Sequence, residues 1–276
     1  SDSCSFTVTV NDTEAPVANC PAPITVSNDS GACGANVTFT LSGSDNCGIA
    51  SEVSSANSGD FFAVGTTTVS YTVTDSAGNL DSCSFTITVN DTEAPVVVCP
   101  APIMVSNDSG QCGAAVTFTL SATDNCGIAS ETSSANSGDF FPVGMTTVTY
   151  TATDSAGNPD SCSFVITVMD NEAPVANCPA NITVANDSGV CGAVVTFTLM
   201  GNDNCGIASS SSSANSGDFF AVGTTTVNYT VTDSAGNTDS CSFTITVNDT
   251  EAPVVTCPAN IVVSNDSGLC GANVPF

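Results

Sequence analysis

Ser82-Cys-Ser-Phe-Thr-Ile-Thr-Val-Asn-Asp-Thr-Glu-Ala-Pro-Val96 alternates apolar and hydroxyl residues and then turns acidic before a proline. This pattern predicts a β-strand that runs directly into a short linker. Closely similar stretches begin at Ser3, Ser161 and Ser240, which places them 79 residues apart by subtraction of their numbers. A fixed period of this length indicates a tandem array of similar domains.

The period divides the 276 residues into about three and a half units. We expect the end of one repeat and a linker at residues 1–14 and complete repeats at 15–93, 94–172 and 173–251, followed by the start of a further repeat at 252–276. A unit of this size buries only a modest core, so cross-links should help to stabilise it.

Within one unit, the residues alternate between apolar and polar in several short runs. Val37, Phe39 and Leu41 alternate with threonines, which predicts a half-buried strand, and the run from Val69 through Tyr71 to Asp75 predicts a second one. The prolines of residues 21–23 predict an edge position for the strand that follows them. Since no segment has a helical period, we predict an all-β chain of tandem immunoglobulin-like antiparallel β-sandwiches in a linear array.

The charge of the chain is one-sided, with 27 acidic residues and no Lys, Arg or His. Nucleic acid is excluded as a partner because no side chain can neutralise a phosphate. An anionic membrane surface should repel the chain, and no apolar run is long enough to predict membrane insertion. We expect no enzyme, because neither a Ser-His nor a Cys-His arrangement is possible and the acids recur in turns and linkers.

Each complete unit carries four of the 15 cysteines. With no His and no Cys-x-x-Cys pair, zinc is disfavoured, and disulfides in an oxidising, extracellular compartment are favoured. Four cysteines allow three pairings, and their spacing alone does not choose among them.

Six short motifs recur in the same order in the complete units. In the first unit they are Cys20-Pro21, Asp45-Asn-Cys-Gly48, Phe62-Ala-Val-Gly-Thr66, Tyr71-Thr-Val-Thr-Asp75, Ala77-Gly-Asn79 and Cys83-Ser-Phe85. With these motifs nearly the whole chain resembles hyalin repeat (HYR) domains, although family members usually carry some Lys and Arg. The resemblance implies an immunoglobulin-like sandwich of extracellular adhesion and matrix proteins, with no catalytic residues to carry over.

The resemblance also implies a disulfide pairing, because simpler family members keep only the equivalents of Cys20 and Cys83. The implied pairs are Cys20–Cys83 with Cys33–Cys47, Cys99–Cys162 with Cys112–Cys126, and Cys178–Cys241 with Cys191–Cys205. The second pair of each unit requires the chain to double back near residues 42–44. The alternative pairing, Cys20–Cys47 with Cys33–Cys83, remains open.

Acidic and amide side chains recur in the linker and in two loops that a sandwich brings to one end. Calcium takes several oxygen ligands of this kind, and the linker also resembles the calcium-binding junction of cadherins. The candidate ligands are Asp12, Glu14, Asp45, Asn46, Asp75, Asp81, Asp91, Glu93, Asp124, Asn125, Asp154, Asp160, Asp170, Glu172, Asp203, Asn204, Asp233 and Asp239. The alternative is that these residues only cap turns and keep the linker hydrated.

These features predict a structural extracellular fibre or stalk that contacts its own neighbouring repeats and self-associates into a filament. The alternative is an adhesion module that recognises glycan or protein through loops such as residues 51–60, although that loop is poor in aromatic and Arg anchors. Glycans could be attached at the sequons that begin at Asn11, Asn28, Asn36, Asn181 and Asn228.

Overall fold

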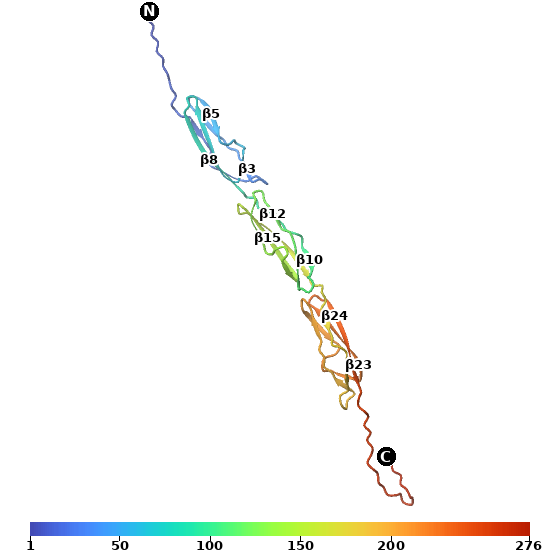
Figure 1. Cartoon of the computed structure of the whole chain (residues 1–276). Helices are drawn as coiled ribbons and strands as arrows, with labels where there is room; N and C mark the ends of the chain where they lie inside the picture. The colour runs from blue at the N-terminus through green and yellow to red at the C-terminus, as the bar shows by residue number, and fades with distance from the viewer. The chain divides into compact units, whose positions relative to one another are not determined.

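A computed structural model describes residues 1–276, and all of its regular elements are β-strands (Figure 1). The first repeat contains β1 (Val17–Asn19), β2 (Ile24–Ser27), β3 (Gly34–Asn36), β4 (Ser42–Ser44), β5 (Ile49–Ser54), β6 (Phe61–Ala63), β7 (Gly65–Asp75) and β8 (Leu80–Asn90). The second contains β9 (Val96–Val98), β10 (Ile103–Ser106), β11 (Gly113–Ala115), β12 (Ser121–Thr123), β13 (Ile128–Ser133), β14 (Phe140–Pro142), β15 (Gly144–Asp154) and β16 (Pro159–Met169). The third contains β17 (Val175–Asn177), β18 (Ile182–Ala185), β19 (Gly192–Val194), β20 (Met200–Asn202), β21 (Ile207–Ser212), β22 (Phe219–Ala221), β23 (Gly223–Asp233) and β24 (Thr238–Asn248).

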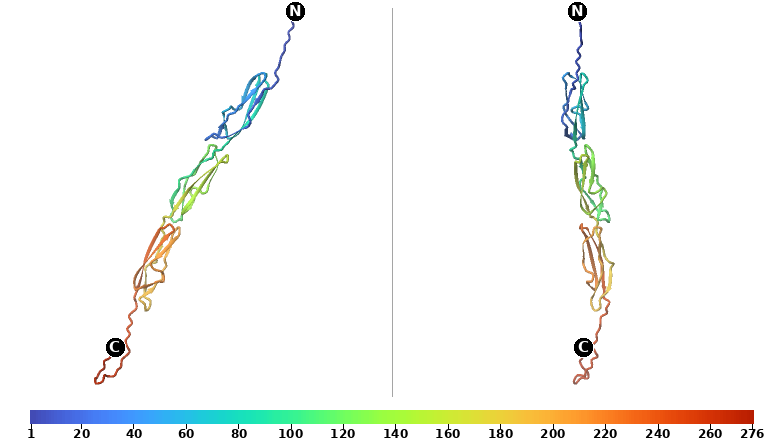
Figure 2. Two further views of the ribbon diagram at one scale, coloured as in Figure 1. Left: turned by 180° about the vertical axis from the view of Figure 1, so that it is seen from behind. Right: turned by 90° about the vertical axis from the view of Figure 1, so that its left-hand side faces the viewer.

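Each repeat forms its strands from its own continuous stretch of chain, as the separate colour ranges in Figure 2 show. The chain divides into two compact units, residues 1–108 with 113–169, and residues 109–112 with 170–276. The first unit therefore holds two repeats. The second unit holds the third repeat together with residues 109–112, which belong to the second repeat.

The larger sheet of the first repeat has the strand order β2-β8-β7-β5. Its centre is the β7–β8 hairpin, in which Tyr71 lies opposite Cys83. β2 lies at the sheet edge, as the prolines before it predict, but it pairs parallel to β8 rather than antiparallel. The pairs β1–β4 and β3–β6 are antiparallel and complete the sandwich.

The core lies between the β7–β8 hairpin and the small β3–β6 pair. Val69, Ile87 and Val89 from the hairpin pack with Ala35 and Phe62 from the pair, and all are buried. The other two repeats bury the equivalent residues. Alternation along β7 and β8 places one row of side chains in this core and leaves the other row, rich in threonine, on the outer face.

The expected strand through Val37, Phe39 and Leu41 is wrong, although these side chains do point into the core. The backbone of this segment finds other partners, because Val37 N–H donates to the Asp60 carbonyl at 3.1 Å and Phe39 N–H donates to Ser58 Oγ at 2.9 Å. The alternation of apolar and polar residues therefore identified the buried side chains correctly. A strand also requires a neighbouring strand whose backbone groups pair with its own.

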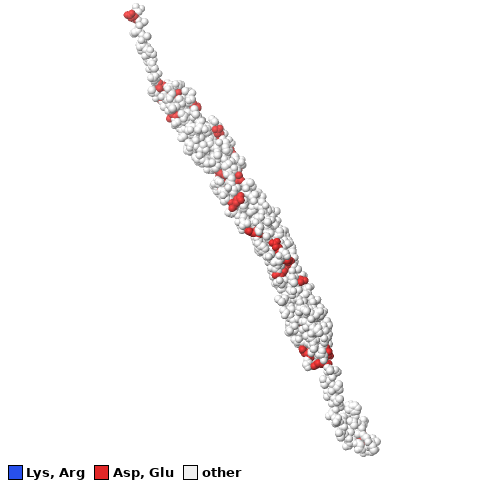
Figure 3. Space-filling view, viewed as in Figure 1, with Lys and Arg blue, Asp and Glu red and all other residues white.

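The structure contains no helix that is long and apolar enough to span a membrane. On the face in Figure 3, acidic side chains gather in small groups with uncharged surface between them. In the sequence the acidic residues recur in the linkers and loops of each repeat.

Candidate metal centre

Three clusters of three aspartates form in the structure, and each cluster follows one rule. One carboxylate comes from a linker, one from an Asp-Asn-Cys-Gly loop, and one from the end of a long hairpin strand. The clusters are Asp12 with Asp45 and Asp75, Asp91 with Asp124 and Asp154, and Asp170 with Asp203 and Asp233. In each cluster one oxygen per residue lies within 4.8 Å of the other two. These nine residues are all candidates from the sequence.

Asp154 is the most firmly held member of the second cluster. It ends β15, and its Oδ1 accepts hydrogen bonds from the backbone N–H groups of Gly157 and Asn158 at 2.6 and 2.8 Å. Hydrogen bonds from backbone N–H groups a few residues further along the chain to an Asp side chain are typical of turns. Burial opposes ionisation, but hydrogen bonds from the Asn158 side chain and the turn backbone hold the pKa of Asp154 below its usual value.

Asn158 is a positioning residue that the ligand candidates did not include. Its Nδ2 donates to Asp154 Oδ2 at 2.7 Å and also to the carbonyl oxygens of Asp91 and Glu93, at 3.3 and 3.2 Å. One amide therefore ties the hairpin turn to the linker. Asn79 and Asn237 make the same contacts in the other clusters. The recurrence of the Ala-Gly-Asn motif was the signal that could have identified them.

The second cluster contains buried oxygens without hydrogen-bond partners. Asp91 is only 7% exposed, and both its Oδ2 and the Oδ2 of Asp124 are buried and unpaired. Burial, followed by the charges of Asp154 and Asp124, raises the pKa of Asp91. The third cluster repeats this arrangement, because Asp170 is 6% exposed and its Oδ2 and Asp203 Oδ1 are unpaired. Unpaired buried carboxylate oxygens are costly unless a cation or hydrogen-bond donor satisfies them.

The donor set fits calcium. Carboxylate and carbonyl oxygens are the ligands that calcium takes, whereas zinc prefers nitrogen and sulfur. The chain offers no Lys, Arg or His that could neutralise three adjacent carboxylates. A divalent cation in the second cluster would be held by Asp91, Asp124 and Asp154 and would supply the missing positive charge.

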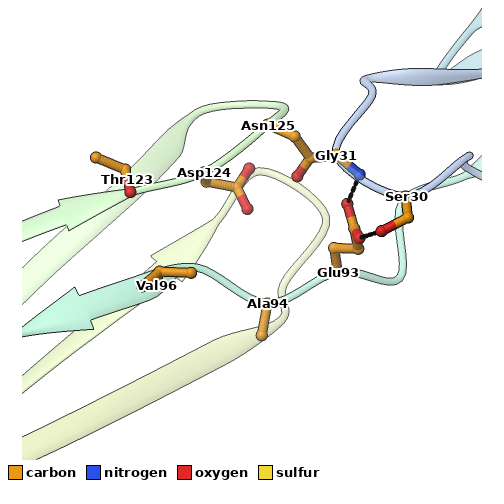
Figure 4. Close-up of a pocket in the computed structure, with 8 residues that line it drawn as sticks. All are labelled: Ser30, Gly31, Glu93, Ala94, Val96, Thr123, Asp124 and Asn125. Carbon is orange, nitrogen blue, oxygen red and sulfur yellow. Dashed lines mark hydrogen bonds between the residues drawn. The ribbon is translucent and has the colours of Figure 1, made fainter.

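The candidate glutamates lie outside the aspartate clusters. Glu93 accepts hydrogen bonds from Gly31 N–H at 2.8 Å and Ser30 Oγ at 3.0 Å, as the dashed lines in Figure 4 show. It therefore fastens the linker to a turn of the first repeat. Glu172 accepts from Gly110 N–H at 2.7 Å in the same way, and Glu14 accepts from Asn46 Nδ2 at 3.0 Å.

The remaining candidates also have structural contacts. Asp81, Asp160 and Asp239 accept hydrogen bonds from the backbone N–H groups at the centres of β1, β9 and β17, at 2.8, 3.4 and 2.8 Å. Asn125 and Asn204 donate to the carbonyl oxygens of Ala32 and Gln111, both at 2.8 Å. Figure 4 shows Asn125 and Asp124 side by side on one loop, facing the turn that carries Gly31.

One predicted disulfide of each complete repeat is confirmed. The structure contains Cys20–Cys83, Cys99–Cys162 and Cys178–Cys241, each with a sequence separation of 63. These bonds join the segment before the first edge strand to the last strand. The alternative that paired Cys20 with Cys47 is therefore wrong.

The other predicted pair is also wrong, because Cys33 bonds to Cys126 and Cys112 bonds to Cys205. Cys33 lies near the end of β8, where Asn28 N–H donates to the Asn90 carbonyl, whereas Cys47 lies beside the opposite end, where Ser76 N–H donates to the Gly48 carbonyl. An 11-residue strand separates these ends by roughly 34 Å. A disulfide requires Cα atoms within about 7 Å, so Cys33 and Cys47 of one repeat cannot meet.

Five cysteines are free and exposed, namely Cys4, Cys47, Cys191, Cys257 and Cys270. Cys47 and Cys191 were predicted to be bonded within their repeats. The bonding pattern joins a Cys33-type residue to the Cys47-type residue of the following repeat, 93 positions later. No cysteine of this sequence stands at that position relative to Cys47 or Cys191.

The HYR domain model matches residues 11–89, 90–168 and 169–247. The chain belongs to the HYR domain family. Hyalin of Strongylocentrotus purpuratus is 40% identical over 290 residues, which cover 99% of this chain and 24% of that protein. Hyalin of Lytechinus variegatus is 39% identical over 290 residues, which cover 98% of this chain and 55% of that protein. This HYR chain thus spans between a quarter and about half of the length of these relatives.

The solved structures that this HYR chain matches include a protocadherin gammaB7 EC3-6 cis-dimer, at 17% sequence identity and a TM-score of 0.33. The match covers 83% of this HYR chain and 72% of that chain. The I67-I69 fragment of the titin I-band is 11% identical with a TM-score of 0.34, and the match covers 86% of this chain and 100% of that one.

Proposed function

We propose that the chain is a structural segment of an extracellular fibre or stalk, in which disulfides link successive HYR repeats and calcium stiffens each junction. The observation that carries the proposal is that two features occur together at one junction between repeats. An inter-repeat disulfide and a buried aspartate cluster both involve the loop that contains Asp124 and Cys126.

The disulfide pattern favours a structural role because it provides two covalent routes along the array. One route follows the linker from Cys83 to Cys99, and crosses each repeat through a bond such as Cys99–Cys162. The other crosses the junctions through Cys33–Cys126 and Cys112–Cys205, joined by residues 112–126. Tension along the chain is therefore shared, and complete unfolding of a repeat cannot extend it by its full length.

The charge pattern favours a junction that depends on a cation. Three carboxylates meet at a linker without any basic side chain, so their mutual repulsion should loosen the cation-free junction. The three carboxylates of a cluster would hold a divalent cation, which would offset their repulsion and would connect the linker to two loops of the following repeat. By linkage, a ligand that binds only the ordered state stabilises that state.

Calcium titration by calorimetry, combined with small-angle scattering, tests the proposal. We expect calcium to bind the oxidised chain and to raise its melting temperature. We also expect calcium to narrow the distribution of intramolecular distances that the scattering measures. Magnesium at the same ionic strength is the control for general screening of charge. If calcium addition gave no heat of binding, and if the melting temperature and the scattering were the same with and without calcium, the proposed stiffening by calcium would be refuted.

A further inference from the structure

We propose that the inter-repeat disulfide controls the cation affinity of the aspartate cluster beside it, so that reduction by a dithiol releases the cation. This inference rests on the proposed calcium function and adds a means of regulation. It follows from the way one turn of the preceding repeat holds two of the three carboxylates.

The turn at residues 28–33, named here the anchor turn, holds the linker that carries Asp91. Asn28 Oδ1 accepts a hydrogen bond from Thr92 N–H at 3.0 Å. Glu93 accepts hydrogen bonds from the N–H of Gly31 and the hydroxyl of Ser30 in the same turn. The two residues that follow Asp91, Thr92 and Glu93, are therefore both fixed to the anchor turn.

The anchor turn also holds the loop that carries Asp124. Asn125 Nδ2 donates to the Ala32 carbonyl at 2.8 Å, and Cys126 is covalently bonded to Cys33. The Cys126 N–H in turn donates to Asp124 Oδ1 at 2.8 Å, which orients the carboxylate and leaves its Oδ2 unpaired. Only one neutral hydrogen bond would connect this loop to the anchor turn if the disulfide were absent.

The disulfide thus keeps Asp124 close to Asp91 and Asp154 against the repulsion between three carboxylates. Without it, cation binding must also order the loop and bring the charges together, and such ordering weakens affinity. We expect reduction to raise the dissociation constant at this cluster by roughly tenfold or more, the cost of ordering one loop with its side chains.

The redox step is an ordinary thiol–disulfide exchange. One sulfur of the dithiol attacks the Cys33–Cys126 bond, forms a mixed disulfide with one cysteine and releases the other as a thiol. The second sulfur of the dithiol then attacks the mixed disulfide and releases the remaining cysteine as a thiol. Cys33 and Cys126 gain two electrons and two protons as thiols, while the dithiol becomes a cyclic disulfide. Because the coupling is reciprocal, bound calcium should make the disulfide harder to reduce by the same factor.

The chain contains its own control. The cluster of Asp12, Asp45 and Asp75 takes its carboxylates from the same three kinds of segment, but in the structure no anchor turn contacts its linker or its Asp-Asn-Cys-Gly loop, and the cysteine of that loop, Cys47, is free. Reduction cannot alter the affinity of this cluster by the proposed route. The oxidised chain should therefore have two strong sites and one weak site, and the reduced chain should have three weak sites.

Calorimetric calcium titration of the whole 276-residue chain tests this inference. The variant Cys33→Ser with Cys126→Ser should weaken one strong site by roughly tenfold and leave the other unchanged. The matched variant Cys112→Ser with Cys205→Ser should weaken the other site instead. The site that keeps its affinity in each variant shows that the chain is folded.

The outcomes separate the two proposals. If the oxidised chain binds no calcium, both the calcium function and its regulation are overturned. If the oxidised chain and both serine variants bind calcium with the same affinities, calcium binding stands and the regulation is overturned. A calcium-dependent shift in the dithiol concentration that reduces Cys33–Cys126 in the unmodified chain would support the coupling, and equal reduction with and without calcium would overturn it.

Discussion

Gly43 and Val73 provide a test of packing for which the chain contains a natural comparison. A Cβ atom added at Gly43 would lie 2.9 and 3.0 Å from the two methyl carbons of Val73, which is itself fully buried. The third repeat keeps Gly and Val at these positions, Gly201 and Val231. The second repeat has alanine at both, Ala122 and Ala152. We infer that the smaller facing side chain is what makes room for the alanine.

The expected energies follow from the geometry. Gly43→Ala should destabilise the first repeat by about 1–3 kcal/mol through overpacking. Val73→Ala removes two buried methyl groups and should cost about 2 kcal/mol including the cavity. The double substitution should be less destabilising than the sum by at least about 1 kcal/mol, because the two residues are in contact.

Hydrogen exchange detected by mass spectrometry on the full chain can measure these energies repeat by repeat. The β7 and β23 peptides, residues 65–75 and 223–233, differ only by Ser70 against Asn228, so their masses distinguish them. β23 serves as the unmodified reference within the same molecule. Additive energies for the two substitutions would refute the packing argument, and so would an Ala152→Val variant in which β15 stays as protected as before.

Three further predictions concern the covalent and ionic links. Full reduction should destabilise each repeat by about 4 kcal/mol from loss of its 63-residue disulfide loop, and an unchanged melting temperature in dithiothreitol would contradict this. A protease site engineered into residues 90–95 should yield one band on a non-reducing gel and two on a reducing gel, because Cys33–Cys126 bridges the cut; two bands without reductant would contradict the inter-repeat bond. Asn158→Ala should weaken calcium binding at the second cluster by roughly 10–100-fold, as expected for a residue that orients ligands, while the equivalent Asn237→Ala should affect only the third cluster; calorimetry with no change in either variant would contradict the positioning role.

The period, the hairpins and the buried face of each hairpin could be predicted from sequence because each depends on local information. Alternation in β7 and β8 states which side chains face inward, and the Asp-Ser-Ala-Gly-Asn turn between them is encoded by its own residues. The membership of the aspartate clusters was largely predictable for a related reason. A sandwich brings alternate loops to one end, and the acids recur in those loops.

Sequence alone could not decide which cysteine is the partner of Cys33, because every repeat contains the same candidates. The choice depends on which end of a sandwich each cysteine occupies, and therefore on the length of β8. The roles of Glu93 and Asn125 are hidden for the same reason, since their partners, Gly31 and Ala32, belong to the preceding repeat.

Residues 37–41 show most directly where local sequence stops being sufficient. They alternate apolar residues with threonine as β7 does, yet they form no strand. β7 has β8 on one side and β5 on the other, and residues 37–41 pair with no strand. The sequence by itself determined the repeat, the alternation and the turns, whereas strand formation and the junction bonds were decided by tertiary structure, because their hydrogen bonds and disulfides join residues far apart in the chain.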